Sequence, residues 1–175
     1  DLRFETAYRF SEHNVLSLLY NRLAVEDEPF RLAYDSDDLT LSHRLDFGDK
    51  HQHRLDSELN VFDQKGTFNI ERTRLREILR LTHSETLRSW YQFEVLDRTQ
   101  GSLSGVPPIG EQSTYLSGTV EHKLYESLVS QFFVFVQQQD FDSGLNILRL
   151  GMQPSFDYRK KNPWGVLMAD YRARL

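Results

Sequence analysis

Alternation of apolar and polar residues with a period of two is the feature that most constrains this chain. The opening segment alternates Leu2, Phe4 and Tyr8 with Arg3 and Arg9. Successive side chains of a β-strand point to opposite faces, so this spacing predicts a strand with one apolar and one charged face. The same pattern returns four more times, at 39–47, 54–61, 87–95 and 167–175.

Other segments have the length of strands but carry apolar residues on both faces. They lie at 14–25, 68–82, 128–138 and 145–158. A helical alternative exists here, because Ser11 is a suitable helix cap and 71–81 places apolar residues on one helical stripe. Aromatic and β-branched residues in 128–136 and turn sequences at strand-like intervals favour strands. The sequence therefore predicts an all-β antiparallel meander of about ten strands, with a soluble α+β domain as the alternative.

The predicted connections fall into two alternating groups. Tight turns are expected near residues 12, 50, 84, 126 and 161, whereas the connections between them include two long polar segments, 26–38 and 98–112. Short turns on one side and longer loops on the other are typical of outer-membrane barrels. We expect 26–38 and 98–112 to be loops on the same, outer side of the sheet.

Composition excludes several classes of function. The chain has no cysteine, which rules out disulfides, thiolate metal sites and thiol catalysis. Its net charge of −5 argues against nucleic-acid binding, which requires a basic surface. No apolar run approaches the roughly 20 residues of a membrane-spanning helix. The sequence contains neither a nucleophile-elbow motif nor a phosphate-binding glycine loop, so it predicts no enzymatic activity and no cofactor.

The hairpin pattern of the whole chain resembles that of Gram-negative outer-membrane β-barrel proteins. It is clearest in HRLDFGDKHQHRLDSEL and EHKLYESLVSQFFVFVQQQDFDSG. The resemblance implies that residues 1–175 form a single segment of a transmembrane β-barrel in the outer membrane, surrounded by lipid. Such a wall acts as a pore or as a sheath for a translocated or enclosed partner, and further copies or a docking protein are possible partners. A soluble β-rich or α+β binding module is the alternative.

The two strand faces then have different expected surroundings. The charged residues expected to line a polar lumen are Arg3, Arg9, Arg44, Asp46, Arg54, Asp56, Glu58, Arg88 and Glu94. The residues expected to face lipid are Phe4, Leu41, Leu59, Phe93 and Tyr171. Aromatic residues near the tight turns predict a girdle at the membrane interface, formed by Tyr8, Phe10, Phe47, Tyr125, Phe156, Tyr158 and Trp164.

His51 and His53 are the weak candidates for a metal site. They are two residues apart, so on a strand they share a face and suit a divalent ion. A metal needs three or four ligands, and no Asp or Glu spacing completes such a set. The favoured interpretation is that these histidines are residues of the rim beside a tight turn.

The order of the turns predicts that further strands are needed to close the barrel. The first strand, 2–11, enters a tight turn, and the last, 165–175, leaves one. If tight turns are periplasmic, both ends lie near the outer face, whereas completed bacterial barrels usually keep both ends inside. We therefore expect about twelve or more strands in all, and no direct pairing between 2–11 and 165–175.

Overall fold

The computed structural model describes residues 1–27, 32–102 and 107–175, and most of these residues are in β-strands. These residues form ten strands, and none of them forms a helix long and apolar enough to cross a membrane. The strands are β1 Leu2–Ser11, β2 Asn14–Asp27, β3 Leu32–Phe47, β4 His53–Gly66, β5 Phe68–Thr82, β6 Leu87–Ser102, β7 Ile109–Tyr125, β8 Leu128–Phe141, β9 Asn146–Asn162 and β10 Gly165–Arg172. The α+β alternative is wrong, since the ambiguous segments are strands.

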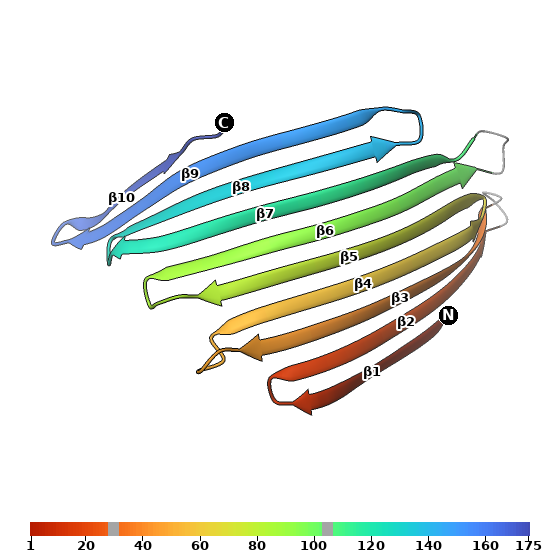
Figure 1. The fold of residues 1–175 in the computed structure, drawn as a ribbon, viewed down its shortest axis with the longest axis horizontal. Coiled ribbons are helices and arrows are strands. Elements are labelled where there is room, and N and C mark those ends of the chain that lie inside the picture. Colours follow the sequence, from red (N-terminus) through yellow and green to blue (C-terminus); the bar gives the residue numbers. More distant parts are fainter. Residues whose placement is uncertain (28–31, 103–106) are drawn as a thin grey trace.

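All ten strands belong to one sheet, in which each strand pairs antiparallel with the next one along the chain (Figure 1). The predicted antiparallel meander of about ten strands is confirmed. The sheet is open, with β1 and β10 at opposite edges and unpaired with each other. Residues 173–175 continue the ladder beyond β10, because Leu175 donates its N–H to the carbonyl of Met152 at 3.1 Å.

The prediction of a long loop at 26–38 is wrong. β2 continues to Asp27 and β3 already begins at Leu32, with pairs such as Ala24 with Asp35 in register. The acidic composition of this segment suggested a loop, but acidic side chains at the end of a strand stay in water while its backbone remains paired. The predicted loop 98–112 shrinks in the same way, because β6 reaches Ser102 and β7 begins at Ile109. Of these two predicted loops, 28–31 and 103–106 lie outside the described residues.

The sorting of long and short connections therefore no longer distinguishes the two ends of the sheet. The connection between β4 and β5 is also short, since β4 runs to Gly66 and β5 starts at Phe68. The described residues of 26–38 and 98–112 lie at the same end of the sheet (Figure 1), as a meander requires. We call this the even end, and the end with the turns near 12, 50, 84, 126 and 163 the tight-turn end. The side of a membrane that either end occupies stays a prediction.

The sheet has no hydrophobic core. Among the described residues no hydrophobic side chain is buried, and the buried polar ones are Ser36, Asn60, Ser89, Ser117, Thr119 and Ser155. β2 to β9 have 14–17 residues each, more than the roughly 9–11 that a tilted strand needs to cross a bilayer. A single layer of long strands without a core must draw its stability from whatever covers its two faces.

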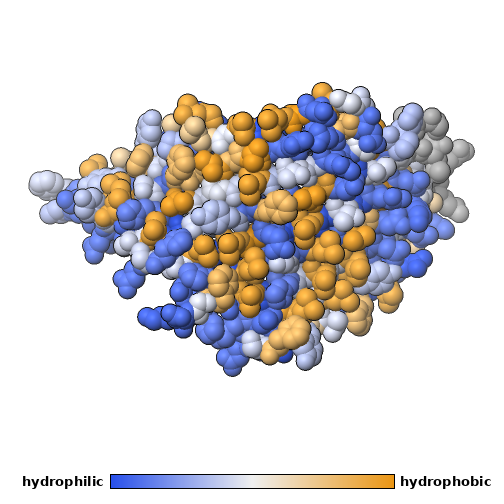
Figure 2. Space-filling model, in the orientation of Figure 1, coloured by the Kyte–Doolittle hydropathy of each residue, from blue (hydrophilic) through white to orange (hydrophobic). Residues whose placement is uncertain are grey.

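Apolar side chains form a band across one face. Residues in register across four strands give one row of this band, Leu41, Leu59, Leu75 and Val95. The same row turns polar in β7 and β8, and the apolar positions there lie nearer the tight-turn end, at Leu116, Val120, Phe132 and Val134. The band thus runs obliquely to the strands, as the strand tilt of a barrel requires. Figure 2 shows hydrophobic side chains over the middle of the sheet and hydrophilic ones toward its ends.

The reversal between β4 and β5 depends on a glycine. Gly66 has a φ of 146°, and a Cβ built on it would lie 2.1 Å from the carbonyl oxygen of Ala33 on β3. Its N–H is bonded to the side chain of Asn69 at 3.0 Å. Gly165 has nearly the same φ, 144°, but a Cβ there would meet nothing within 4 Å. A comparison of substitutions at Gly66 and Gly165 therefore distinguishes the cost of backbone strain from the cost of steric conflict.

We predict that Gly66→Ala destabilises the protein more than Gly165→Ala. Both substitutions force an L-residue into a conformation that costs about 1–3 kcal/mol, but only the first drives a methyl group into a backbone oxygen. The difference in the free energy of unfolding, from urea titration of the protein in detergent, should be at least about 1 kcal/mol. Equal effects would mean that the approach of Ala33 is not a constraint on this hairpin.

Candidate functional site

The register of the strands separates all the predicted face residues as expected. The nine charged residues from Arg3 to Glu94 lie on one face, the charged face, and the five from Phe4 to Tyr171 lie on the other, the apolar face. Five of the buried polar residues, Ser36, Asn60, Ser117, Thr119 and Ser155, are on the charged face. Since side chains crowd on the concave side of a curved sheet, this burial indicates that the charged face is the concave one. That the faces meet a lumen and lipid remains a prediction.

Ion pairs connect neighbouring strands across the charged face. Arg54 Nε lies 2.7 Å from a carboxylate oxygen of Asp46, whose other oxygen contacts Arg44 at 3.2 Å. Further pairs join Arg74 with Glu58 at 2.6 Å, Arg80 with Asp56, and Arg76 with Glu94 at 3.9 Å. These side chains are about a third to a half exposed, apart from the shielded Asp46, so each pair contributes little to stability. Their effect is to hold the charged groups in a fixed pattern above the sheet.

A ladder of four arginines on β5 did not emerge from the sequence alone. Arg72, Arg74, Arg76 and Arg80 all lie on the charged face. The Nε groups of the first three are buried without a hydrogen-bond partner. Arg72 instead donates through Nη2 to Asn60 at 2.9 Å and stacks over the ring of Phe62 at 5.2 Å. Arginine at every second position from 72 to 76 was a signal in the sequence, but apolar residues on both faces of 68–82 obscured it.

The charged face is basic, although the chain as a whole carries −5. Its basic residues in the strands are Arg3, Arg9, Arg44, Arg54, Arg72, Arg74, Arg76, Arg80, Arg88, Arg98, Lys123, Arg149, Arg159, Lys161 and Arg172. They outnumber the acidic ones, Glu5, Asp38, Asp46, Asp56, Glu58, Glu94, Glu111, Glu121, Asp157 and Asp170. Acidic residues collect instead on the apolar face at the even end, at Asp35, Asp37, Asp63, Glu71, Asp97 and Asp140.

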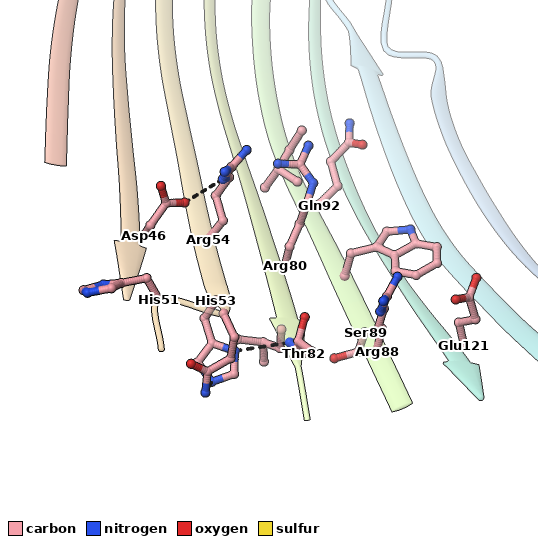
Figure 3. Close-up of a pocket in the computed structure, with 14 residues that line it drawn as sticks. Asp46, His51, His53, Arg54, Arg80, Thr82, Arg88, Ser89, Gln92 and Glu121 are labelled. Carbon is pink, nitrogen blue, oxygen red and sulfur yellow. Dashed lines mark hydrogen bonds and ion pairs between the residues drawn. The ribbon is translucent and has the colours of Figure 1, made fainter. Parts of the chain in front are cut away.

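A recess of about 690 Å³ lies on the charged face toward the tight-turn end (Figure 3). Arg54, Arg80 and Arg88 reach it from three successive strands, and Asp46 and Glu121 stand at its two sides. Arg88 makes no ion pair within the described residues, whereas the other two arginines do. The recess therefore offers a free guanidinium group, which suits an anionic or strongly polar solute.

His51 and His53, the histidines predicted to lie at the rim, contact different residues. The ring of His51 stacks on that of His13 from the neighbouring turn, with centroids 3.4 Å apart. His53 accepts a hydrogen bond at Nδ1 from the backbone N–H of Thr82 at 3.2 Å and lies beside Phe47. Within the described parts of the chain, no three His, Cys, Asp or Glu residues come close enough to hold a metal ion. His51 and His53 thus have structural contacts that a shared metal would have to displace.

An aromatic cluster interrupts the polar residues of the charged face on β7 and β8. Phe135 lies between Phe133 and Tyr115, with ring centroids 5.7 and 6.3 Å away. Its ring covers Gly151 of β9, where a Cβ would be 2.3 Å from Cε1. Glutamines surround the cluster, at Gln131, Gln137, Gln139 and Gln153. Aromatic faces beside amide groups offer apolar stacking and hydrogen bonds together.

The aromatic residues predicted for a girdle lie near the tight-turn end. Tyr8 and Phe10 contact each other edge to face with centroids 4.7 Å apart. Tyr125 and Tyr158 both lie beside Leu128 across the β7–β8 and β8–β9 ladders, and Trp164 in the last turn is 96% exposed. Their position is the one a girdle requires, while contact with a membrane interface remains a prediction.

Comparison with known proteins finds similarity among solved structures. No protein-family model matches the chain, and no curated protein matches it. Among solved structures it is similar to one described as a bacterial polysaccharide outer membrane secretin, with a TM-score of 0.52 and 13% sequence identity. The likeness covers 98% of this chain and 61% of that one, so the chain spans less than two thirds of the length of its structural neighbour. At this identity the likeness supports the fold.

Proposed function

We propose that the chain forms part of the wall of an outer-membrane β-barrel, with its charged face lining a water-filled passage. The observation that carries this proposal is a two-faced, single-layer sheet in which no described hydrophobic side chain is buried. In water the apolar band would expose Leu, Phe and Val side chains across many strands, which soluble proteins avoid. Lipid against that band and water against the charged face satisfy both faces.

Closure of such a wall requires strands that pair with β1 and β10. An unpaired backbone group in lipid costs several kcal/mol, so exposed edges are not tolerated there. The pairing strands come from the same polypeptide or from another copy. The structural neighbour is an outer-membrane protein, which supports this location for the wall.

That neighbour is also a polysaccharide secretin, and we extend the proposal to a carbohydrate polymer as cargo. Sugar rings combine apolar C–H faces with hydroxyl groups. The cluster of Tyr115, Phe133 and Phe135 offers flat apolar surfaces, and the surrounding glutamines and arginines offer donors and acceptors. A pore for small anions is the second candidate, because the ladder of β5 arginines favours negative charge.

Substitutions at two adjacent residues on opposite faces test whether one face meets lipid and the other meets water. Leu59→Arg places a charge on the apolar face and should cost about 2–4 kcal/mol near the bilayer midplane. Glu58→Leu replaces a charge on the watery face, loses one half-exposed ion pair and should cost less than about 1 kcal/mol. The measurement is the folded fraction on membrane assembly, together with the free energy of unfolding in lipid vesicles.

The partitioning of the unaltered protein separates this proposal from a soluble binding module. The wall should enter detergent or lipid and resist unfolding in cold SDS. A stable monomer in detergent-free buffer, or equal tolerance of Leu59→Arg and Glu58→Leu, would refute the assignment.

Ion selectivity tests the charged face as the lining of the passage. The triple variant Arg72→Gln, Arg74→Gln and Arg76→Gln should lower the permeability ratio of chloride to potassium by about twofold or more, because the local positive potential falls. Arg22→Gln, on the apolar face, is the control and should leave the ratio unchanged. Planar-bilayer recordings of the full protein give both values. An unchanged ratio in the triple variant would place these arginines away from the ion path.

The carbohydrate cargo predicts a role for Phe135. Phe135→Ala should weaken block of the ion current by a neutral glucan hexasaccharide about three- to tenfold, the loss expected for one aromatic stacking contact. Val134→Ala, the adjacent residue on the apolar face, should not change the block. Absence of block in the unaltered protein would count against glucan-like cargo and leave the anion pore as the candidate.

A further inference from the structure

A polar island interrupts the apolar face on β2 to β5. It consists of Asn14, His43, Ser57 and Glu77, each half-buried. His43, Ser57 and Glu77 are directly in register across three neighbouring strands. Ser57 donates its hydroxyl to a carboxylate oxygen of Glu77 at 2.5 Å, and His43 Nε2 is 2.9 Å from the side-chain oxygen of Asn14.

Apolar side chains enclose His43, Ser57 and Glu77. The row toward the even end is Leu18, Leu41, Leu59 and Leu75, and the row toward the tight turns is Leu45, Leu55 and Leu79. Asn14, the first residue of β2, is in register with Leu45 at the end of that second row. Leu16 and Phe93 end the row of His43, Ser57 and Glu77. These three side chains therefore lie in the middle of the apolar band, where a long side chain has no short route to water.

Lipid is a poor neighbour for His43, Ser57 and Glu77. Within the described residues Glu77 has Ser57 as its single hydrogen-bond partner and forms no ion pair. Ionisable side chains inside a membrane are costly, and they mark positions that contact another polar group. Lipid chains supply no such group, so the surface over the island should be protein.

We propose that this part of the wall is an interface between two copies of the chain, related by a two-fold axis that passes beside Ser57. The proposal rests on the proposed function, since it takes the apolar face to lie in the membrane. Strands are about 4.8 Å apart, so His43 and Glu77 lie at equal distances on either side of Ser57. A two-fold rotation exchanges the two sides, which brings His43 of each copy opposite Glu77 of the other.

Charge complementarity favours a second copy over another occupant. The island holds an imidazole, His43, and a carboxyl group, Glu77, and the two-fold arrangement pairs both at once. The enclosing leucines and Phe93 then pack against their equivalents and keep water from the paired charges. The apolar surroundings strengthen such pairs, whereas a single uncompensated carboxylate would weaken the wall.

Cysteine cross-linking tests the position of the axis. The chain has no cysteine, so Ser57→Cys introduces one thiol into each copy. Because residue 57 lies beside the proposed axis, the two thiols of a dimer lie close together. Oxidation of the full protein in native membranes should give a covalent dimer in high yield. Leu148→Cys, on β9 of the apolar face and 65% exposed, is the matched control and should stay mostly monomeric. Equal cross-linking at both positions, or cross-linking of Ser57→Cys to a different protein, would overturn the two-fold arrangement.

A charge exchange tests the pairing itself. His43→Glu and Glu77→His each place like groups opposite one another and should weaken dimerisation in mild detergent by about 30-fold or more. The double variant restores opposite charges with the positions exchanged and should recover most of the dimer. Sedimentation equilibrium gives the dissociation constants. A dissociation constant that is the same in all three variants as in the unaltered protein would refute the pairing.

Failure of this inference is distinguishable from failure of the proposed function. A protein that enters the outer membrane, conducts ions and remains a monomer would overturn the dimer alone. A protein that never enters a membrane would overturn both.

Discussion

Backbone pairing between neighbouring strands is the interaction on which the rest of this structure depends. Nine antiparallel ladders join the ten strands, and among the described residues no buried hydrophobic core supplements them. In water such hydrogen bonds add little net stability, because the unpaired groups bind water equally well. In an apolar medium each unpaired group is costly, so the same ladders become strong. The ladders therefore stabilise the fold most in an apolar medium, which is also the environment that suits the apolar band.

The ladders also decide where charge accumulates. Alternation sends every second residue of a strand to the same face, so the arginines of β5 stand together although other residues separate them in the sequence. The net charge of the whole chain is −5, yet the charged face is basic, because many acidic residues lie on the other face at the even end. Total charge indicates the behaviour of the chain in solution, whereas the face-by-face charge bears on what a passage would conduct.

Period-two alternation, together with turn sequences at strand-like intervals, predicted the ten-strand meander and the face of every charged residue expected to line a lumen. Local composition misled at 26–38, where acidic residues suggested a loop but the backbone pairs as strands. Propensity was ambiguous at 68–82, and the arginine ladder was hidden there. The polar island could not be predicted from the sequence, because it brings together His43, Ser57 and Glu77 from three strands. Only the register, which depends on pairing between distant residues, brings them together.

The position of the polar island within the apolar band determines whether its side chains can reach water. A single polar residue near the edge of an apolar band reaches water by bending along the surface. Glu77 has no such route, because Leu75 and Leu79 flank it on its own strand and Phe93 lies beside it. Ser57 donates to one oxygen of the carboxylate, and the other oxygen has no hydrogen-bond partner among the described residues. An apolar residue at position 77 would have avoided this cost and fitted the band. Its presence there therefore has a physical rationale only if the wall meets a surface that supplies a hydrogen-bond donor at the depth of Glu77, and His43 of a second copy is such a donor.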